Sequence, residues 1–187
     1  MHFESLASPA ELRAHAQSEL QKYFQHFPAE AIGLQAIAGQ LADTSVDPFS
    51  RANMQGHITT SGVVYDATAD KVLLIHHRTL NRWLQPGGHH EGLDRLDVSA
   101  AREVEEETGV SVRLSKAASA VIDTTATLIP DIDQPKARAR MSPGDASAAL
   151  TPQWAEVRGV RWVAREALWA LQSARFARLV GKLLHTL

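Results

Sequence analysis

The sequence predicts an α/β fold, a sandwich of helices around a mixed sheet, preceded by an N-terminal helical extension. Residues 8–43 carry apolar side chains at helical spacing, whereas from residue 57 onward β-branched and apolar runs have strand periodicity. Strand and helix patterns then follow each other without strict alternation, which favours a mixed sheet. We expect residues 1–50 to form the extension and residues 51–187 to form the main domain.

Two helices are expected in the extension. Over residues 8–25, Ser8 and Glu11 match a capping box and apolar residues recur at helical spacing. A second helix is expected after Pro28, through residues 29–43. The two should form a helical hairpin packed on the main domain, with a homodimer surface as the alternative.

The main domain is expected to begin with a β hairpin. "HITTSGVVYD" (57–66) and "KVLLIHHR" (71–78) are strand-like runs separated by a turn. Trp83 and Leu84 can end a further short strand, and Pro86 with two glycines is expected to break it. The glycines are therefore expected to follow directly after the hairpin.

Further elements follow from the same periodicities. A helix is expected over residues 97–108, closed by Gly109, which suits a left-handed cap. One or two strands are expected in residues 110–129, and another in residues 156–163. Residues 164–187 predict an amphipathic helix with a buried face. That face carries Leu168, Leu171, Phe176, Leu179, Val180 and Leu183.

Residues 130–153 are rich in Pro, Ala, Ser and Asp and are long for an ordinary connection. We expect this segment to be irregular, either a mobile stretch or a loop that covers a substrate. If it folds over a site, Lys136, Arg138 and Arg140 can reach a phosphate.

Composition narrows the function classes. The chain has 187 residues, a formal net charge of −2 and no cysteine. Disulfides, thiolate zinc sites and a cysteine nucleophile are therefore excluded. The nearly neutral charge argues against a duplex nucleic acid partner, and no apolar run approaches the length of about 20 residues that spans a membrane. We expect a soluble cytoplasmic protein that binds neither.

Carboxylates crowd into "LQPGGHHEGLDRLDVSAAREVEEETGV", residues 84–110. On a helix that advances ~100° per residue, Glu103, Glu106 and Glu107 fall within an arc of roughly 100°. Such glutamates can form a solvated face, but three like charges one turn apart repel unless a cation offsets them. Hard oxygen ligands suit Mg²⁺ or Mn²⁺. We therefore expect a metal cradle, to which Asp94 can add a fourth carboxylate from the preceding loop.

The same stretch resembles the Nudix box. Gly88, then Asp94 after five residues, then "REVEEETGV" from Arg102 to Val110 match the glycine, acid, Arg-Glu, aliphatic, Glu-Glu, glycine and aliphatic of that box at its spacing. Asp94 departs from it, because the family usually has glutamate there. The preceding strands also resemble those of bacterial Nudix hydrolases, so the resemblance covers residues 57–110 well and the remainder loosely.

The resemblance implies an α/β/α sandwich and Mg²⁺-dependent hydrolysis of a nucleoside diphosphate linked to another moiety. In that family the glutamates matching Glu103, Glu106 and Glu107 bind metal. The arginine matching Arg102 orients them through ion pairs, and the glycine matching Gly87 can contribute its carbonyl. These residues are the expected catalytic and metal-binding set.

Other positions are candidates for a second role. Asp94 is one methylene shorter than glutamate, which favours a metal contact through water. Arg82 and Trp83 are candidate substrate-binding residues, although a tryptophan before a tight turn can simply pack. His89 can face a phosphate or a metal, or be a solvent-facing or structural residue. Glu156 sits where some family members carry an additional ligand or base.

The predicted activity is that of a Nudix pyrophosphohydrolase acting on acid anhydrides in phosphorus-containing substrates, by attack of a metal-activated water. Its partner would be a small nucleotide-type diphosphate. The alternative is a Nudix-like module that binds a nucleotide without cleaving it. Asp94 and the irregular segment 130–153 motivate that alternative.

Overall fold

The structure is a computed structural model and describes residues 6–114, 123–125, 136–143, 150–171 and 174–186. Its N-terminal region begins with helix α1 (Pro9–His26). The Oγ of Ser8 accepts a hydrogen bond from the Glu11 N–H at 3.3 Å, and the Glu11 carboxylate accepts one from the Ala7 N–H at 2.9 Å. The expected cap of the first helix is therefore confirmed.

The second part of the N-terminal region differs from the expected single helix. A 3-10 helix, η1 (Pro28–Leu34), comes first and is followed by α2 (Gln35–Ala42). Gly33 lies near the junction, where its low helix propensity favours a change of helix type.

One mixed sheet collects eight strands of the described chain. They are β1 (Thr59–Asp66), β2 (Lys71–His77), β3 (Arg82–Leu84), β4 (Gly87–His89), β5 (Val112–Leu114), β6 (Asp123–Thr125), β7 (Lys136–Pro143) and β8 (Val157–Ala164). β1 is central, because it pairs antiparallel with β2 and β4 and parallel with β7. β2 also pairs antiparallel with β3 and β8.

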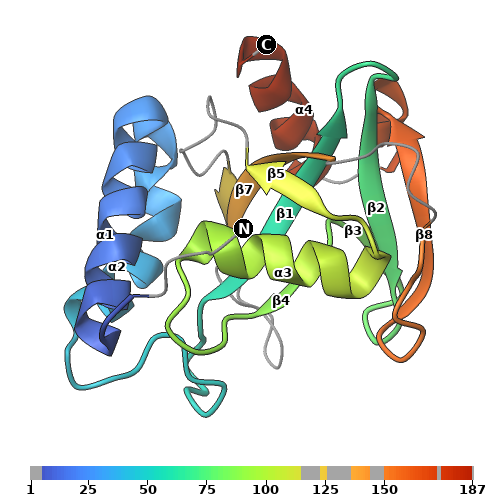
Figure 1. The fold of residues 1–187 in the computed structure, drawn as a ribbon. Helices are drawn as coiled ribbons and strands as arrows, with labels where there is room; N and C mark the ends of the chain where they lie inside the picture. Colours follow the sequence, from blue (N-terminus) through green and yellow to red (C-terminus); the bar gives the residue numbers. More distant parts are fainter. Residues whose placement is uncertain (1–5, 115–122, 126–135, 144–149, 172–173, 187) are drawn as a thin grey trace.

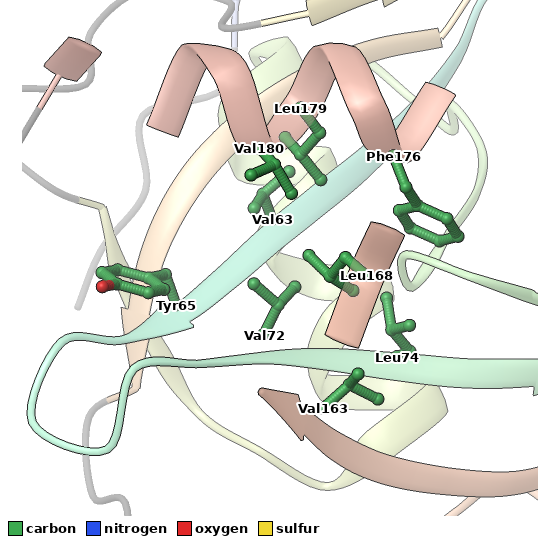
Figure 2. Packing of buried hydrophobic residues seen from close by; sticks show 9 residues of the cluster. All are labelled: Val63, Tyr65, Val72, Leu74, Val163, Leu168, Phe176, Leu179 and Val180. Carbon is green, nitrogen blue, oxygen red and sulfur yellow. The ribbon is translucent and has the colours of Figure 1, made fainter. Parts of the chain in front are cut away.

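Helices cover both faces of this sheet, so the expected α/β/α sandwich is confirmed (Figure 1). Alternate residues of a strand point to opposite faces. Val64 and Leu73 accordingly pack with Val104 of α3 (Leu96–Thr108). On the other face, Val63 lies with Leu179 in a cluster that joins β1 and β2 to α4 (Ala174–Thr186), as Figure 2 shows.

The N-terminal helices pack on the main domain, as the hairpin interpretation predicted. Ile58 and Leu96 belong to the apolar cluster that α1, η1 and α2 form among themselves. A buried polar contact adds to it, because the Lys182 Nζ of α4 lies 2.9 Å from Glu30 Oε1 and also bonds the Tyr23 hydroxyl. The helical region is thus tied to both helical layers of the sandwich.

The expectation of an irregular segment over residues 130–153 was wrong for residues 136–143. They form β7, which pairs with β1 in parallel over residues 136–141. "KARARM" alternates charged and small residues, a strand period that the surrounding Pro, Ser and Gly obscured. Residues 130–135 and 144–149 lie outside the described part.

The expected C-terminal helix is also divided. A 3-10 helix, η3 (Arg165–Leu171), comes before α4. Leu168, Phe176, Leu179 and Val180 are buried as predicted, and Leu171 is half-buried against the same cluster. No helix within the described residues has the length and apolar character needed to cross a membrane.

Candidate functional site

The glycines of the acidic motif lie in β4, directly beside β1. Gly87 is the register partner of Ser61, and Gly88 is the partner of Thr60. A Cβ at Gly87 would overlap the Ser61 side chain, and one at Gly88 would overlap the Glu103 carboxylate. The short strand β3 ends at Leu84 before Pro86, as expected. The glycines then form a further strand, β4, because their missing side chains let strand and helix approach closely.

Helix α3 is fixed against β1 by local signals and one buried contact. It ends at Gly109, whose φ of +73° is the left-handed conformation expected of this cap. In its first turn, the buried hydroxyl of Ser99 lies 3.0 Å from that of Thr60. This contact holds α3 in register with the strand that neighbours the glycines.

Two of the three predicted glutamates are buried between α3 and β4. Glu103 is 7% exposed and Glu107 is 2% exposed. The Gly87 N–H donates a hydrogen bond to Glu107 Oε2 at 2.7 Å, while Glu103 packs under Gly88. Glu106, although within the same helical arc, is exposed. The structure therefore brings Gly87, Glu103 and Glu107 together at one strand.

Arg102 links the remaining members of the set. Its guanidinium donates to Glu103 Oε1 at 2.9 Å and to Glu106 Oε2 at 2.8 Å, and it lies 3.5 Å from the carbonyl of His89. Burial opposes the Arg102 charge, but the hydrogen bond with Glu106 and the charge of Glu103 raise its pKa. Arg102 thus stays cationic and bonds two carboxylates, while its role in orienting them for a metal remains a prediction.

The electrostatics of Glu103 are unusual for an acid. Burial raises the pKa of Glu103 from 4.5 to about 7. The positive charge of Arg102 opposes this rise, whereas the negative charges of Glu106 and Glu156 add to it. The group is therefore a carboxylate whose ionised form requires more positive charge than Arg102 supplies.

Within the described residues, no three acidic or histidine side chains stand close enough together to enclose a metal ion. Arg102 bridges Glu103 and Glu106, and Glu107 is turned toward the Gly87 amide. The donor set nevertheless fits a hard divalent cation in chemistry, since carboxylate oxygens are its preferred ligands. Such a cation would also favour the ionised form of Glu103, which burial and, to a lesser extent, the charges of Glu106 and Glu156 disfavour.

Asp94 lies at the other end of the motif. It is half-buried in the turn before α3, and its charge acts on the buried His90. Burial lowers the pKa of His90, and Asp94 opposes that change. The metal role predicted for Asp94 remains a prediction.

The predicted substrate-binding residues are more dispersed. Arg82 is exposed at the start of β3, and the next residue, Trp83, is half-buried against the main apolar cluster. The Arg161 guanidinium lies 3.9 Å from the centre of the Trp83 ring. His89 belongs to β4 rather than to a loop, and its ring stacks on His57 with centroids 5.0 Å apart.

Glu156 is exposed in the turn before β8 and is connected to the end of β2. The Arg78 N–H donates to the Glu156 carbonyl at 2.8 Å, and the Arg78 guanidinium donates to the Trp154 carbonyl at 2.6 Å. The charge of Glu156 reaches Glu103, as its effect on that pKa shows. This acid therefore belongs to the electrostatic surroundings of the glutamate set.

Sequence reasoning missed the polar residues of β1. Thr59, Thr60 and Ser61 are all at most 1% exposed, although they stand in a central strand. The available signal was the run "TTS" between "HI" and "GVVY", since hydroxyl groups are uncommon inside an apolar strand unless something bonds them.

Comparisons with known proteins give the family. The family model described as NUDIX domain matches residues 56–184. A hydrolase of the NUDIX family from Clostridium perfringens is similar, with a TM-score of 0.56 and 21% identity, over 68% of this chain and 97% of that chain. An Ap4A hydrolase from C. elegans, in a binary complex, gives 0.57 and 15%, over 68% and 95%.

A third similar structure is the MutT protein from Methanosarcina mazei Go1, with a TM-score of 0.51 and 18% identity, over 66% of this chain and 88% of that chain. No curated protein matches the sequence. Likenesses at these identities establish the fold, whereas the NUDIX match covers most of the chain and includes the whole acidic motif. The chain therefore belongs to the Nudix family of pyrophosphohydrolases.

Proposed function

We propose that this Nudix enzyme cleaves a pyrophosphate bond in a nucleoside diphosphate linked to another moiety, by attack of a water activated by Mg²⁺ or Mn²⁺. The observation that carries the proposal is the burial of Glu103 and Glu107 against the glycines of β4. Buried carboxylates are costly unless cations accompany them, and Arg102 already pairs with Glu103 and with the neighbouring Glu106.

Each residue of the set would have a distinct part. Glu103, Glu106 and Glu107 would hold the metal, together with the carbonyl of Gly87. When bound, the metal supplies charge neutralisation of the diphosphate and a lowered pKa for the attacking water. Arg102 orients two of the carboxylates through its hydrogen bonds of 2.9 and 2.8 Å.

Residues outside this set are proposed on chemical type and position. Glu156 is proposed as a further acid at the metal, because its charge already acts on that of Glu103. Asp94 is proposed to act through water, while His89, Arg82 and Trp83 are proposed to contact the substrate. Of these residues, His89 is nearest to the proposed catalytic set, because it is the last residue of β4, the strand that contains Gly87.

The experiment is a substrate panel with purified protein and Mg²⁺. It includes ADP-ribose, nucleotide sugars, nucleoside triphosphates and dinucleoside polyphosphates, the last because one similar structure is an Ap4A hydrolase. We expect turnover of at least one class. Folded protein that binds a nucleotide tightly but turns over none would support the binding-only alternative instead.

Matched variants of α3 connect turnover to the proposed residues. Glu106→Gln and Glu107→Gln should each lower kcat/KM by about 100-fold or more. Glu105→Gln is the control, because Glu105 is exposed on the same helix and its carboxylate bonds Ser111 instead. Equal activity of all three variants would contradict the assignment.

A further inference from the structure

One face of β1 carries a row of polar groups. The Thr60 hydroxyl contacts Ser99 of α3, so residues 59 and 61 point to the opposite face by strand alternation. Farther along this opposite face, Val63 and Tyr65 pack in the apolar cluster under α4 (Figure 2). The α4 side of β1 therefore changes from apolar at one end to polar at the other.

Within the part of the chain that the structure describes, the polar end has side-chain atoms that no hydrogen bond satisfies. Thr59 and Ser61 are both 1% exposed, and neither the Thr59 Oγ1 nor the Ser61 Oγ has a partner among these residues. The same is true of the His57 Nε2, two residues earlier, and of the Gln85 Nε2. Leaving a buried polar atom without a hydrogen bond costs free energy, so such atoms are rare in protein cores. Unpaired polar atoms at alternate positions of one strand therefore call for a functional explanation.

This row adjoins the catalytic carboxylates at Gly87. Gly87 is the register partner of Ser61, and the Gly87 N–H donates a hydrogen bond to the Glu107 carboxylate. Gln85 lies two residues before Gly87, and the carbonyl of Pro86 between them accepts a hydrogen bond from the Gly62 N–H at 2.9 Å. A ligand group at the polar row would therefore lie across β1 and β4 from the glutamates, which pack on the α3 face of these strands.

The chemistry of the row points to an acceptor-rich anion. The Gln85 Nε2 is a donor only, and both hydroxyls can donate. On the other side of β1, the register partners of Thr59 and Ser61 are Lys136 and Arg138 of β7, so basic residues stand at the matching positions. Hydroxyl and amide donors favour phosphoryl oxygens, which only accept hydrogen bonds, over a group that must itself donate.

We propose that Thr59, Ser61 and Gln85 form a subsite for a phosphoryl group of the substrate other than those joined by the bond that is cleaved. The inference rests on the proposed function and adds a substrate class to it. Substrates with three or more consecutive phosphates would use the subsite, whereas those with two would not. Thr59 and Ser61 would then be specificity-determining residues for phosphate chain length.

The first test measures binding without catalysis. Sodium tripolyphosphate is titrated into the full chain in EDTA by calorimetry, with the parent protein, Thr59→Val and Ser61→Ala. Each variant should raise Kd by about tenfold or more, since each removes a hydrogen bond to a charged group. Melting temperatures should stay equal or rise, because an unsatisfied hydroxyl is replaced by an apolar group.

Ser99→Ala is the matched control, because it removes a buried hydroxyl from the other face, where Thr60 satisfies it. It should leave the Kd for tripolyphosphate unchanged. Kd values of Thr59→Val and Ser61→Ala within twofold of the parent would overturn the proposal. An equal loss in Ser99→Ala would overturn it as well.

A kinetic test separates this inference from the proposed function. With Mg²⁺, Thr59→Val should raise KM by about tenfold for substrates with three or more phosphates and leave kcat and two-phosphate substrates little changed. Equal KM changes for both classes would overturn the subsite. A parent that hydrolyses nothing would refute the proposed function, while the EDTA titration would still decide on the subsite.

Discussion

Substitution of Glu103 by glutamine should stabilise the metal-free protein at neutral and alkaline pH. Burial raises the pKa of Glu103 from 4.5 to about 7 in the native state. The native protein therefore holds this proton more tightly than the unfolded chain does. The free energy of unfolding consequently falls as the pH rises from about 4.5 to about 7, and the full loss persists at higher pH.

The magnitude follows from the size of that shift. At about 1.4 kcal/mol per pKa unit, a rise from 4.5 to about 7 corresponds to about 3 kcal/mol of lost stability when Glu103 is ionised. Glutamine keeps the shape and an oxygen that can accept from Arg102, but it carries no charge. Glu103→Gln should therefore gain about 3 kcal/mol at pH 8 and nothing at pH 4.5.

Urea denaturation in EDTA, followed by tryptophan fluorescence at both pH values, measures this difference. Glu106→Gln is the control, because the Glu106 side chain is 49% exposed and its substitution should change stability by less than about 1 kcal/mol at either pH. A Glu103→Gln protein no more stable than the parent at pH 8 would refute the reasoning. The same variant should lose its hydrolytic activity.

Three further substitutions test the packing around the site. Gly88→Ala would push a methyl group into the Glu103 carboxylate, so kcat/KM should fall by about 100-fold with an unchanged circular dichroism spectrum; full activity would be inconsistent with the contact. Gly109→Ala places a side chain at φ +73° and against Thr151, and should cost at least about 1 kcal/mol in urea denaturation. Lys182→Met leaves Glu30 without its ammonium partner and should cost about 1–3 kcal/mol in the same assay; an unchanged midpoint would show that this contact does not stabilise the helical region.

Local sequence signals were sufficient to predict helix α3. The shared arc of the glutamates and the buried positions of Val104 and Thr108 follow from a period of 3.6 residues, and the left-handed cap follows from the conformational freedom of Gly109. The first two strands and α1 were likewise predictable, because their periodicity and capping residues lie within one element. The sequence alone was therefore enough to identify the acidic residues and their Nudix spacing.

Contacts distant in sequence decided the remainder. The pairing of β7 with β1 joins residues more than 70 positions apart, so no local period could place it. Glu103 and Glu107 are buried, and Glu106 is not, because β4 lies against one side of α3. The positions of the three glutamates on the helix do not predict this contact.

The sequence by itself determined which side chains α3 presents together, because helix geometry is a short-range property of the backbone. Only the tertiary structure decided which of those charges leave water, because that depends on a strand packed against the helix. Electrostatic character follows burial, so the raised pKa of Glu103 and the unpaired hydroxyls of Thr59 and Ser61 exist only in the folded chain.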